Sequence, residues 1–477
     1  MAEDAGLTLA EAIGRFAAES TFDELPESVA ESVCLRILDI LGICVAAVSM
    51  NTSQAAREWV LEQGGSEQAH AIGLGVRVPA VQAAFVNGVL AHSLDYDDTH
   101  LPSVVHPSAS VIPAALATAE LVGVSGAATI AAAAAGLEIC VRLGMAGYDE
   151  RARTSIFFRH GQHATSICGA IGGAVSSGLL LGLGAEGITN AVAVAASMGS
   201  GLIEANRTGG TVKRMHCGWA AHAAVSAAQL VARGFTGPPT VLEGRFGFFQ
   251  AWLRGEFDGS AVTEGLGTSW LVPDIVFKPY PANHFTHAAI DAALELRKRG
   301  IRPDDVDRAV VGVPAPTLPT VGEPIDVKRR PETGYMAQFS APYAVTAALF
   351  GGRGLGVSLA DFSDELVRDP KRRALMERID VVADEHCTDI FPRQFPAVLW
   401  VLTRDGRELS VEVMENRGGP ARPLAAADIA TKFRENVAGL LDSEAMAQVE
   451  ATVANLAEEP DIGIVLSPIV PAGTDGR

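Results

Sequence analysis

Hydrophobic residues recur every three to four positions along much of the first half of the chain. The clearest case is the segment from Pro26 to Ala47, an amphipathic helix that opens with Pro and Glu. Its apolar face is formed by Val29, Val33, Ile37, Leu41 and Cys44. The same spacing predicts further helices at 79–94, 108–121, 129–144, 165–183, 185–197 and 216–233. Together these segments predict one all-helical domain.

The pattern changes near residue 275, where aromatic residues and prolines become frequent and short β-branched runs follow. Strands are predicted at 309–313, 379–383, 397–403 and 408–413. The last two strands form a hairpin, because the Asp405-Gly406 pair between them is typical of a tight turn. Helices predicted at 286–299 and 338–350 would pack on the sheet, which gives a smaller α+β domain.

Helical periodicity returns near the carboxyl terminus, at 427–441 and 444–456. The fold class is therefore predicted to be mainly α with a smaller α+β domain. We expect a helical domain over 1–275, an inserted α+β lid domain over 276–417, and a last part over 418–477 that rejoins the helical domain.

Composition narrows the classes of function. The 477 residues carry a net charge of −19 and a pI near 5.0, so nucleic acid and anionic membranes are not expected as partners. An anionic substrate would need locally concentrated cations, which makes clusters of Lys and His informative. The acidic amino terminus lacks the basic and apolar pattern of a signal peptide, so a cytoplasmic location is expected.

The sequence predicts no cofactor. Six widely spaced cysteines without a CxxC pair disfavour a zinc ribbon or an iron–sulfur site. Glycine-rich stretches at 169–173 and 182–184 follow no predicted strand, so they indicate helix packing rather than dinucleotide binding. The uncharged segment 165–184 is long enough for a membrane span, but its many Gly, Ala and Ser residues favour a helix in a soluble core.

The densest polar cluster is LDYDDTH at 94–100, followed by His106. Its residues could form a loop that caps the next helix through Ser108, hold a metal ion, or perform acid–base chemistry in which an Asp polarises a His. No EF-hand or comparable ligand pattern accompanies the cluster, which disfavours the metal. The loop and the acid–base site both stay open.

Two further motifs combine basic residues with helix starts. His163 directly precedes the uncharged helix, near the positive helix end that favours anions. Lys213 and His216 are spaced i and i+3, so they share one helix face. A buried structural role is the more common explanation for a lone histidine such as His163, and a solvated loop explains Lys213 and His216 equally well. The alternative is that they bind a carboxylate.

A rigid loop with two prolines, FKPYPANHFTH, spans 277–287 and leads into a helix. His284 and His287 again lie at i and i+3, and Thr286 could cap the helix. The loop lies at the predicted domain boundary, and binding sites prefer domain interfaces. A functional site is therefore favoured over a purely structural seam.

The ordered set of motifs resembles the MmgE/PrpD family over almost the whole chain. The matching segments are RILDILGICVAA at 36–47, AAFVNGVLAHSLDYDDTH at 83–100, HPSASVIPAALA at 106–117, GQHATSICGAIGGA at 161–174, VKRMHCGWAAHAA at 212–224, VLEGRFGFF at 241–249, FKPYPANHFTHAAIDAA at 277–293 and QFSAPYAVTAALFGG at 338–352. The resemblance implies a homodimer and an active cleft between a helical domain and an α+β lid, without metal or nucleotide.

The resemblance also implies the site residues. The positions that match functional residues of decarboxylase-like members are Asp95, Thr99, His106, His163, Lys213 and Tyr343. One position departs from the pattern. Asn283 stands where decarboxylase-like members have a His, and His284 stands where dehydratase-like members often have Arg.

We therefore expect a catalytic group and a substrate-binding group. The catalytic group is Asp95, His106, Lys213, Tyr343 and His284, and the binding group is Thr99, His163, Asn283 and His287. His106, oriented by Asp95, is the first choice to move a proton, with Tyr343 or His284 on the opposite face.

The expected reaction is cofactor-independent dehydration of a small hydroxy-polycarboxylate such as 2-methylcitrate. Epimerisation of a small dicarboxylate comes second and decarboxylation of the cis-aconitate type third. Carboxylate binding without catalysis is the remaining alternative. All four would require a small anionic carboxylate as the partner.

Overall fold

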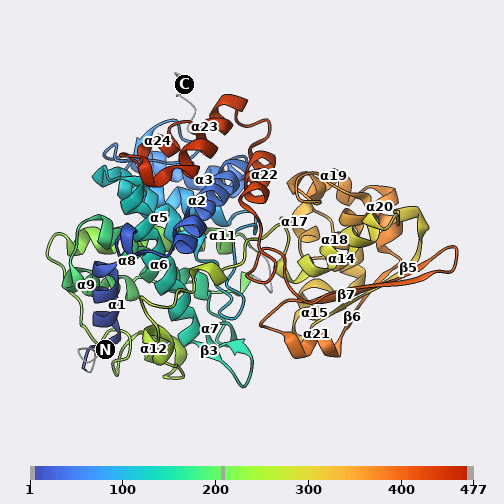
Figure 1. Cartoon of the computed structure of the whole chain (residues 1–477), viewed down its shortest axis with the longest axis horizontal. Coiled ribbons are helices and arrows are strands. Elements are labelled where there is room, and N and C mark those ends of the chain that lie inside the picture. The colour runs from blue at the N-terminus through green and yellow to red at the C-terminus, as the bar shows by residue number, and fades with distance from the viewer. Residues whose placement is uncertain (1–5, 206–209, 470–477) are drawn as a thin grey trace. The chain divides into compact units, whose positions relative to one another are not determined.

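The computed structural model describes residues 6–205 and 210–469 and divides into two compact units (Figure 1). The first unit comprises Met1–Ile275 with Val437–Arg477, and the second comprises Val276–Asn436. Each unit buries its own set of apolar side chains.

Nearly all regular structure in the described part of the first unit is helical. Its longer helices are α1 (Leu9–Glu19), α2 (Glu27–Ala47), α3 (Asn51–Gln63), α4 (Ala80–His92), α5 (Ser108–Val122), α6 (Gly126–Ala146), α8 (Ala164–Leu180), α9 (Ala185–Ala196), α11 (Val212–Val231) and α23 (Ser443–Ala454). Shorter ones are α7 (Ile156–Arg159), α12 (Phe248–Leu253), α13 (Ser260–Thr263), α24 (Gly463–Leu466), η1 (Phe22–Glu24), η2 (Val272–Asp274) and η7 (Leu456–Glu458). Two short hairpins pair β1 (Ala69–His70) with β2 (Arg77–Val78), and β3 (Tyr148–Asp149) with β4 (Thr154–Ser155). The predicted helical domain is confirmed.

Helix α8 lies at the centre of the first unit and packs against α5, α6, α9 and α11. This close packing requires small residues. A Cβ added to Gly172 would lie 2.5 Å from the carbonyl oxygen of Gly136 in α6, and one added to Gly173 would lie 2.8 Å from Cβ of Ala224 in α11. The glycine-rich stretch therefore serves helix packing, as predicted.

One described helix, α6, is long and apolar enough to cross a membrane, and the bent pair α2 and α3 would pass the same test only if it formed one span. In α6, 89% of the most apolar window is buried inside the protein. A buried core helix has this composition, so the finding is weak evidence for a span.

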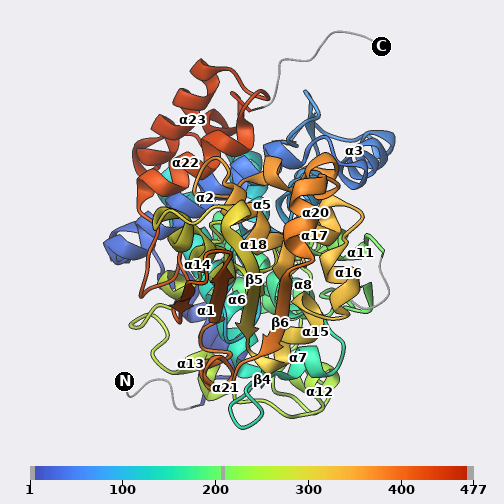
Figure 2. The same ribbon diagram turned by 90° about the vertical axis from the view of Figure 1, so that its right-hand side faces the viewer.

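The second unit is built on a mixed sheet in the order β6-β5-β7-β8. Its strands are β5 (Val306–Val313), β6 (Ile379–Ala383), β7 (Ala397–Thr403) and β8 (Glu408–Val413). β5 pairs parallel with β6 and antiparallel with β7, and β7 and β8 form the predicted hairpin. Helices α14 (His287–Lys298) and α18 (Ala341–Phe350) pack against each other and against the sheet (Figure 2). The predicted α+β domain is confirmed.

Short helices connect the strands of the second unit. They are η3 (His284–Thr286), η4 (Pro303–Asp305), η5 (Ala315–Thr317), α15 (Leu318–Val321), α16 (Ile325–Arg329), α17 (Gly334–Ala337), η6 (Leu359–Phe362), α19 (Asp364–Val367), α20 (Pro370–Met376) and α21 (Glu385–Ile390). Helix α22 (Ala426–Val437) follows the last strand.

The second unit ends at Asn436, whereas the predicted lid ends at residue 417. The difference is helix α22, whose Asp428 pairs with Arg417 at 3.5 Å and whose Thr431 lines a pocket walled by α14. The sequence prediction followed the return of helical periodicity. Periodicity shows that a helix forms, but it does not show on which core the helix packs.

Candidate active site

The polar residues singled out in the first half of the chain come together in the first unit. They lie at the end of α4, in the loop that leads to α5, and at the amino-terminal ends of α5, α8 and α11. These segments extend over more than 100 residues of the sequence, from His92 to Lys213, so helix packing brings them together.

Asp98 fixes the loop between α4 and α5. Its carboxylate pairs with Arg36 at 2.6 Å and accepts hydrogen bonds from the hydroxyl and backbone N–H of Ser108. Arg36 is fully buried in α2 and also donates to the carbonyl oxygens of Val272 and Ile275. A buried charge needs such partners, because desolvation is costly otherwise. Asp98 therefore has a structural role.

Asp95 and Lys213 form the predicted link between the loop and α11. The ammonium group of Lys213 lies 3.1 Å from Oδ1 of Asp95, and the two side chains are 16% and 6% exposed. Asp95 adopts a positive φ of 52°, which Asp tolerates better than most residues. This turn aims the carboxylate at the first turn of α11.

His106 is held through one ring nitrogen. Its Nδ1 lies 2.7 Å from the carbonyl oxygen of Asp98 and 3.0 Å from the hydroxyl of Thr99. A carbonyl oxygen only accepts, so Nδ1 of His106 carries a proton and donates. In the neutral ring, Nε2 then holds the lone pair. The half-buried His106 is thus oriented as a base, with Asp98 and Thr99 as the observed holders.

Four imidazole rings form a row in this cluster. The ring centroids of His92 and His106 lie 5.4 Å apart, those of His92 and His163 5.6 Å, and those of His163 and His216 4.9 Å. Nδ1 of His163 lies 2.9 Å from Nδ1 of His216, so one donates and the other accepts.

Burial keeps two of these rings, His163 and His216, neutral. Burial, and then the neighbouring His92 and Lys213, lower the pKa of His216 to about 4. Burial, followed by His92 and Lys213, also holds the pKa of His163 well below its usual range. Neutral rings can accept protons or donate hydrogen bonds at neutral pH.

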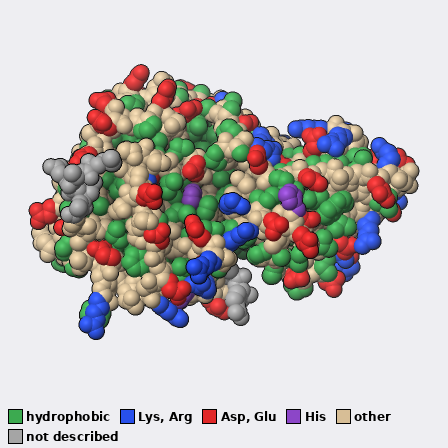
Figure 3. Space-filling view, turned by 60° about the horizontal axis from the view of Figure 1, so that its bottom comes forward, with side chains coloured by type: hydrophobic (Ala, Val, Ile, Leu, Met, Phe, Trp, Pro, Cys, Tyr) green, Lys and Arg blue, Asp and Glu red, His purple; other side chains and the backbone are tan. Residues whose placement is uncertain are grey.

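The cluster is locally suited to an anion. Lys213 and the positive ends of α8 and α11 meet there, and the N-cap residues His163 and Thr211 make no side-chain capping bond. The chain as a whole is strongly acidic, and acidic and basic side chains are interspersed on the face that Figure 3 shows.

The loop 277–287 lies in the second unit, where the packing around its histidines is aromatic. The rings of His284 and His287 lie 4.6 Å apart, and His284 meets the ring of Phe395 edge-on at 5.4 Å. Nε2 of His287 donates to the carbonyl oxygen of Ala282 at 3.0 Å. Oδ1 of Asn283 accepts from the backbone N–H of Phe285 and caps η3.

Tyr343, predicted to be catalytic, is completely buried in α18. Its hydroxyl donates to the backbone carbonyl of Asp361, and its ring packs 5.4 Å from that of Phe362. Burial raises the pKa of Tyr343 to about 12. In this structure Tyr343 therefore stabilises the core of the second unit.

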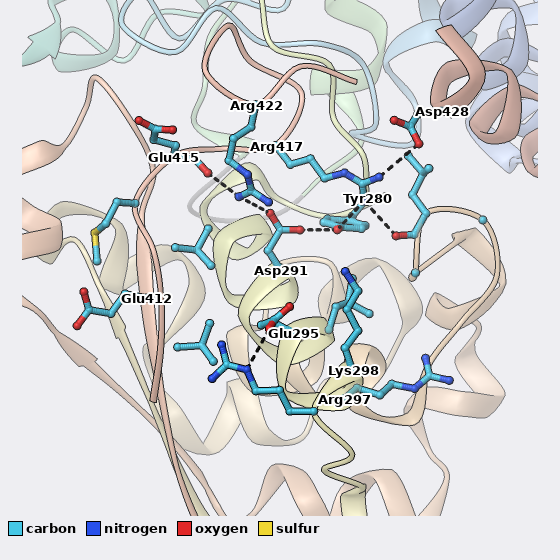
Figure 4. Close-up of a pocket in the computed structure, with 18 of the residues that line it drawn as sticks. Tyr280, Asp291, Glu295, Arg297, Lys298, Glu412, Glu415, Arg417, Arg422 and Asp428 are labelled. Carbon is cyan, nitrogen blue, oxygen red and sulfur yellow. Dashed lines mark hydrogen bonds and ion pairs between the residues drawn. The ribbon is translucent and has the colours of Figure 1, made fainter. Parts of the chain in front are cut away.

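A second charged region lines a pocket of about 1260 Å³ in the second unit (Figure 4). Tyr280 donates to Asp291 at 2.5 Å, Asp291 pairs with Arg422 at 3.0 Å, and Arg417 donates to the Tyr280 hydroxyl at 3.4 Å. Arg417 also pairs with Asp428 at 3.5 Å. These charges neutralise one another and tie the loop, α14 and α22 together.

Within residues 6–205 and 210–469, no group of three or more His, Cys, Asp or Glu side chains is arranged to hold a metal ion. The carboxylate of Asp98, which belonged to the possible ligand set in the sequence, is engaged by Arg36 and Ser108.

Sequence reasoning missed several residues of the cluster. His92 and Asp97 form a pair at 2.7 Å, and Thr165 accepts from the backbone N–H of His106 at 3.1 Å. Asp97 lies within the polar segment that was singled out, and His92 ends the helix just before it. The signal available in the sequence was His92 itself, a polar residue in the last turn of the largely apolar helix α4.

Known proteins match this chain over most of its length. The MmgE/PrpD N-terminal domain matches residues 11–259, and the MmgE/PrpD C-terminal domain matches residues 280–458. Individual relatives match as well. The chain is 29% identical over 405 residues to the cis-aconitate decarboxylase of Homo sapiens, and the match covers 82% of this chain and 79% of that protein. It is 25% identical over 467 residues to the cis-aconitate decarboxylase of Aspergillus terreus, covering 94% and 93%. It is 28% identical over 393 residues to the 2-methylcitrate dehydratase of Salmonella typhimurium, covering 76% and 78%. Since the two matched domains span nearly all of the described fold, the chain belongs to the MmgE/PrpD family.

Proposed function

We propose that the chain is a lyase that acts on a small polycarboxylate by moving a proton at the carbon next to a carboxylate. The observation that carries this proposal is the convergence of Lys213 with a row of imidazoles in a chain of net charge −19. The names of the relatives support the same class of substrate, because they act on cis-aconitate or 2-methylcitrate.

Lys213 and His163 are assigned to bind the substrate carboxylates. Lys213 is partly exposed, and its ion pair with Asp95 holds the ammonium group in place. Loss of a proton from the carbon next to a carboxylate places further negative charge on the carboxylate oxygens. Fixed donors stabilise that charge in the transition state more than in the ground state.

His106 is assigned to take the proton. Its Nδ1 donates to the carbonyl of Asp98, so the lone pair on Nε2 accepts the proton from carbon. In a dehydration the C–H electron pair forms a C=C bond, and the β-hydroxyl leaves as water after accepting a proton from an acid. The predicted roles of Asp95 in orienting His106, and of His284 and His287 towards substrate, stay hypotheses.

Dehydration of a hydroxy-polycarboxylate is the first candidate. Asn283 fills the position that decarboxylase-like members give to a His, and its side chain caps η3. Decarboxylation of cis-aconitate is the second candidate, because the relatives with 29% and 25% identity carry that name. In that reaction CO₂ leaves and the carbon gains a proton instead.

The test is incubation of the protein with 2-methylcitrate, citrate and cis-aconitate in D₂O, followed by NMR and measurement of CO₂. Deuterium in the substrate or product with loss of water supports dehydration, and CO₂ release with a deuterated product supports the second candidate. Exchange without any bond cleavage would indicate an epimerase, and no exchange with any acid would indicate binding alone. Either of these results would overturn the lyase proposal.

A variant tests the assigned base. His106→Gln should lower the rate by at least about 100-fold, because general-base catalysis contributes this much. Circular dichroism should show an intact fold. A folded His106→Gln protein with full activity would remove His106 from the mechanism while leaving the substrate class open.

A further inference from the structure

His92 and Asp97 are the most deeply buried pair of the cluster. Nδ1 of His92 lies 2.7 Å from Oδ2 of Asp97, and both side chains are 0% exposed. His92 ends helix α4, and Asp97 lies five residues later in the loop that Asp98 anchors. Neither residue was needed to assign the proposed proton transfer.

The charges around the pair favour an imidazolium. The loop brings together the carboxylates of Asp95, Asp97 and Asp98, and Lys213 and Arg36 pair with the first and the last of them. An imidazolium 2.7 Å from Asp97 compensates the remaining carboxylate, because burying a carboxylate without a compensating charge is strongly disfavoured. Nε2 of His92 is buried and has no hydrogen-bond partner among the described residues. The bond to Asp97 is therefore the one observed hydrogen bond that anchors this ring.

The pair lies beside both of the rings that matter most for the proposed reaction. The ring of His92 is 5.4 Å from that of His106 and 5.6 Å from that of His163, centroid to centroid. We propose that His92 and Asp97 form a buried imidazolium–carboxylate pair, which acts as a positioning pair by holding one fixed positive charge beside His106 and His163.

The consequence is electrostatic. A positive charge on His92 opposes protonation of the neighbouring rings, so His106 keeps its lone pair and remains a base as the pH falls. His92 has no exposed surface, so it acts through His106 and not by touching the substrate. The predicted effect on the basicity of His106 rests on the proposed function. The charge state of His92 does not depend on that function.

Other titratable groups surround the pair on several elements. They are Cys44 on α2, Asp95 and Asp98 on the loop, His106 before α5, His163 before α8, and Lys213, His216 and Cys217 on α11. Burial and the charge of Asp97 raise the pKa of the Cys44 and Cys217 thiols, so both stay neutral. Asp98 is paired with Arg36. Within the row of imidazoles, His92 has an observed carboxylate partner, which is Asp97.

The charge state can be measured without any substrate. The full chain, labelled with ¹⁵N-histidine, is examined by NMR at pH 7, and the His92 signals are assigned by their loss in His92→Gln. Both ring nitrogens should show the chemical shifts of an imidazolium. A neutral ring, with one protonated and one bare nitrogen, would overturn the proposal whether or not the chain proves to be a lyase.

Kinetics test the role of the pair. At an effective dielectric of about 20, a unit charge at this ring separation shifts protonation by about two pH units, and the opposite charge of Asp97 offsets part of that. We expect the acidic limb of the kcat/KM profile to move to higher pH by about one unit in His92→Gln, with kcat lowered and KM little changed. Asp97→Asn should move the limb in the same direction, because His92 then loses its proton.

The double variant His92→Gln/Asp97→Asn should shift the profile no further than either single variant, because both changes remove the same charge. His222→Gln is the matched control: His222 lies on α11 and stacks on Trp219 at 5.2 Å. It should leave the limb unchanged. The positioning role would be refuted if the acidic limb of the kcat/KM profile stayed at the same pH in folded His92→Gln and Asp97→Asn. A shift of that limb to lower pH in Asp97→Asn would refute it as well.

Discussion

Two pairs of basic residues with the same spacing, i and i+3, have different surroundings in this protein. In the first unit, Lys213 is partly exposed and pairs with Asp95, and His216 shares a proton with His163. In the second unit, His284 and His287 are buried among aromatic rings, and the charges next to them neutralise one another around Tyr280. Spacing on a helix face therefore identifies which residues lie together, and their neighbours decide whether they can meet an anion.

The difference lies in the groups next to the ion pairs. Around Tyr280 each observed guanidinium has a carboxylate partner, and such a network joins structural elements. In the imidazole row, Lys213 and His92 each pair with a carboxylate, and burial keeps the adjacent rings of His163 and His216 neutral. The first arrangement stabilises a fold, and the second leaves neutral rings that can accept or donate a proton.

The largest expected effect contrasts one lysine from each region. Lys213→Ala should lower kcat/KM by about 100-fold to 1000-fold, because a fixed charge that stabilises the transition state is lost. Lys298→Ala removes an exposed lysine that lines the pocket of the second unit, and activity should stay within about twofold. Steady-state kinetics on the acid identified by deuterium exchange measures both. Equal losses of kcat/KM in Lys213→Ala and Lys298→Ala would show that the two regions do not differ in their importance for activity.

A second prediction concerns stability in acid. Burial, and then Arg36, lower the pKa of His100 to about 4, so the folded state resists a proton that the unfolded chain binds near pH 6.5. The unfolded state therefore binds more protons as the pH falls, and stability decreases from about pH 6.5 towards pH 4. This one residue should account for roughly 2 kcal/mol between pH 7 and pH 5.

Urea unfolding at the two pH values measures the effect. His100→Gln should make the pH dependence shallower, although it will also change the stability at pH 7 because Nδ1 of His100 bonds Ser103. The control is His386→Gln, which changes an exposed histidine of the second unit and should leave the slope unaltered. An unchanged slope in His100→Gln would show that His100 does not resist protonation.

The smallest effects are expected from the two buried tyrosines of the second unit. Tyr280→Phe leaves Asp291 with one donor fewer and should cost about 1–3 kcal/mol of stability. Tyr343→Phe leaves a carbonyl oxygen without its donor and should cost about 1 kcal/mol. Both variants should retain most of their activity once folded. A Tyr343→Phe protein of normal stability and no activity would instead support the catalytic role predicted from sequence.

Much of the fold could be predicted because the helices and strands are strongly patterned. The four strands of the sheet and the long helices α2, α5 and α8 match the predicted segments within a few residues. Helices α1 and α3 were missed. The periodicity of α3 is weak, since only Ser53, Ala56 and Val60 are buried in it. A weak apolar face leaves little signal in the sequence.

The sequence predicted which residues form the candidate site, but it did not predict all the hydrogen bonds between them. Asp95 and Lys213 were both singled out, and the structure pairs them. The predicted role of Asp95 in orienting His106 stays a prediction, and the ring bonds to Thr99 and to the backbone of Asp98 were not predicted. Backbone carbonyls carry no side-chain signature, so no pattern of residue types could have revealed that contact. The predicted homodimer and cytoplasmic location stay predictions.

The two facing Nδ1 atoms of His163 and His216 lie 2.9 Å apart and can share only one hydrogen. When His163 supplies that hydrogen, its own Nε2 is bare and can only accept. When His216 supplies it, Nε2 of His163 carries a hydrogen and can only donate. Both rings stay neutral in this switch only if Nε2 of His163 gains a hydrogen and Nε2 of His216 loses one as the shared hydrogen moves between the Nδ1 atoms. The complete exchange reverses the polarity of His163 at Nε2, so one residue can serve both an anionic substrate and a proton-bearing product.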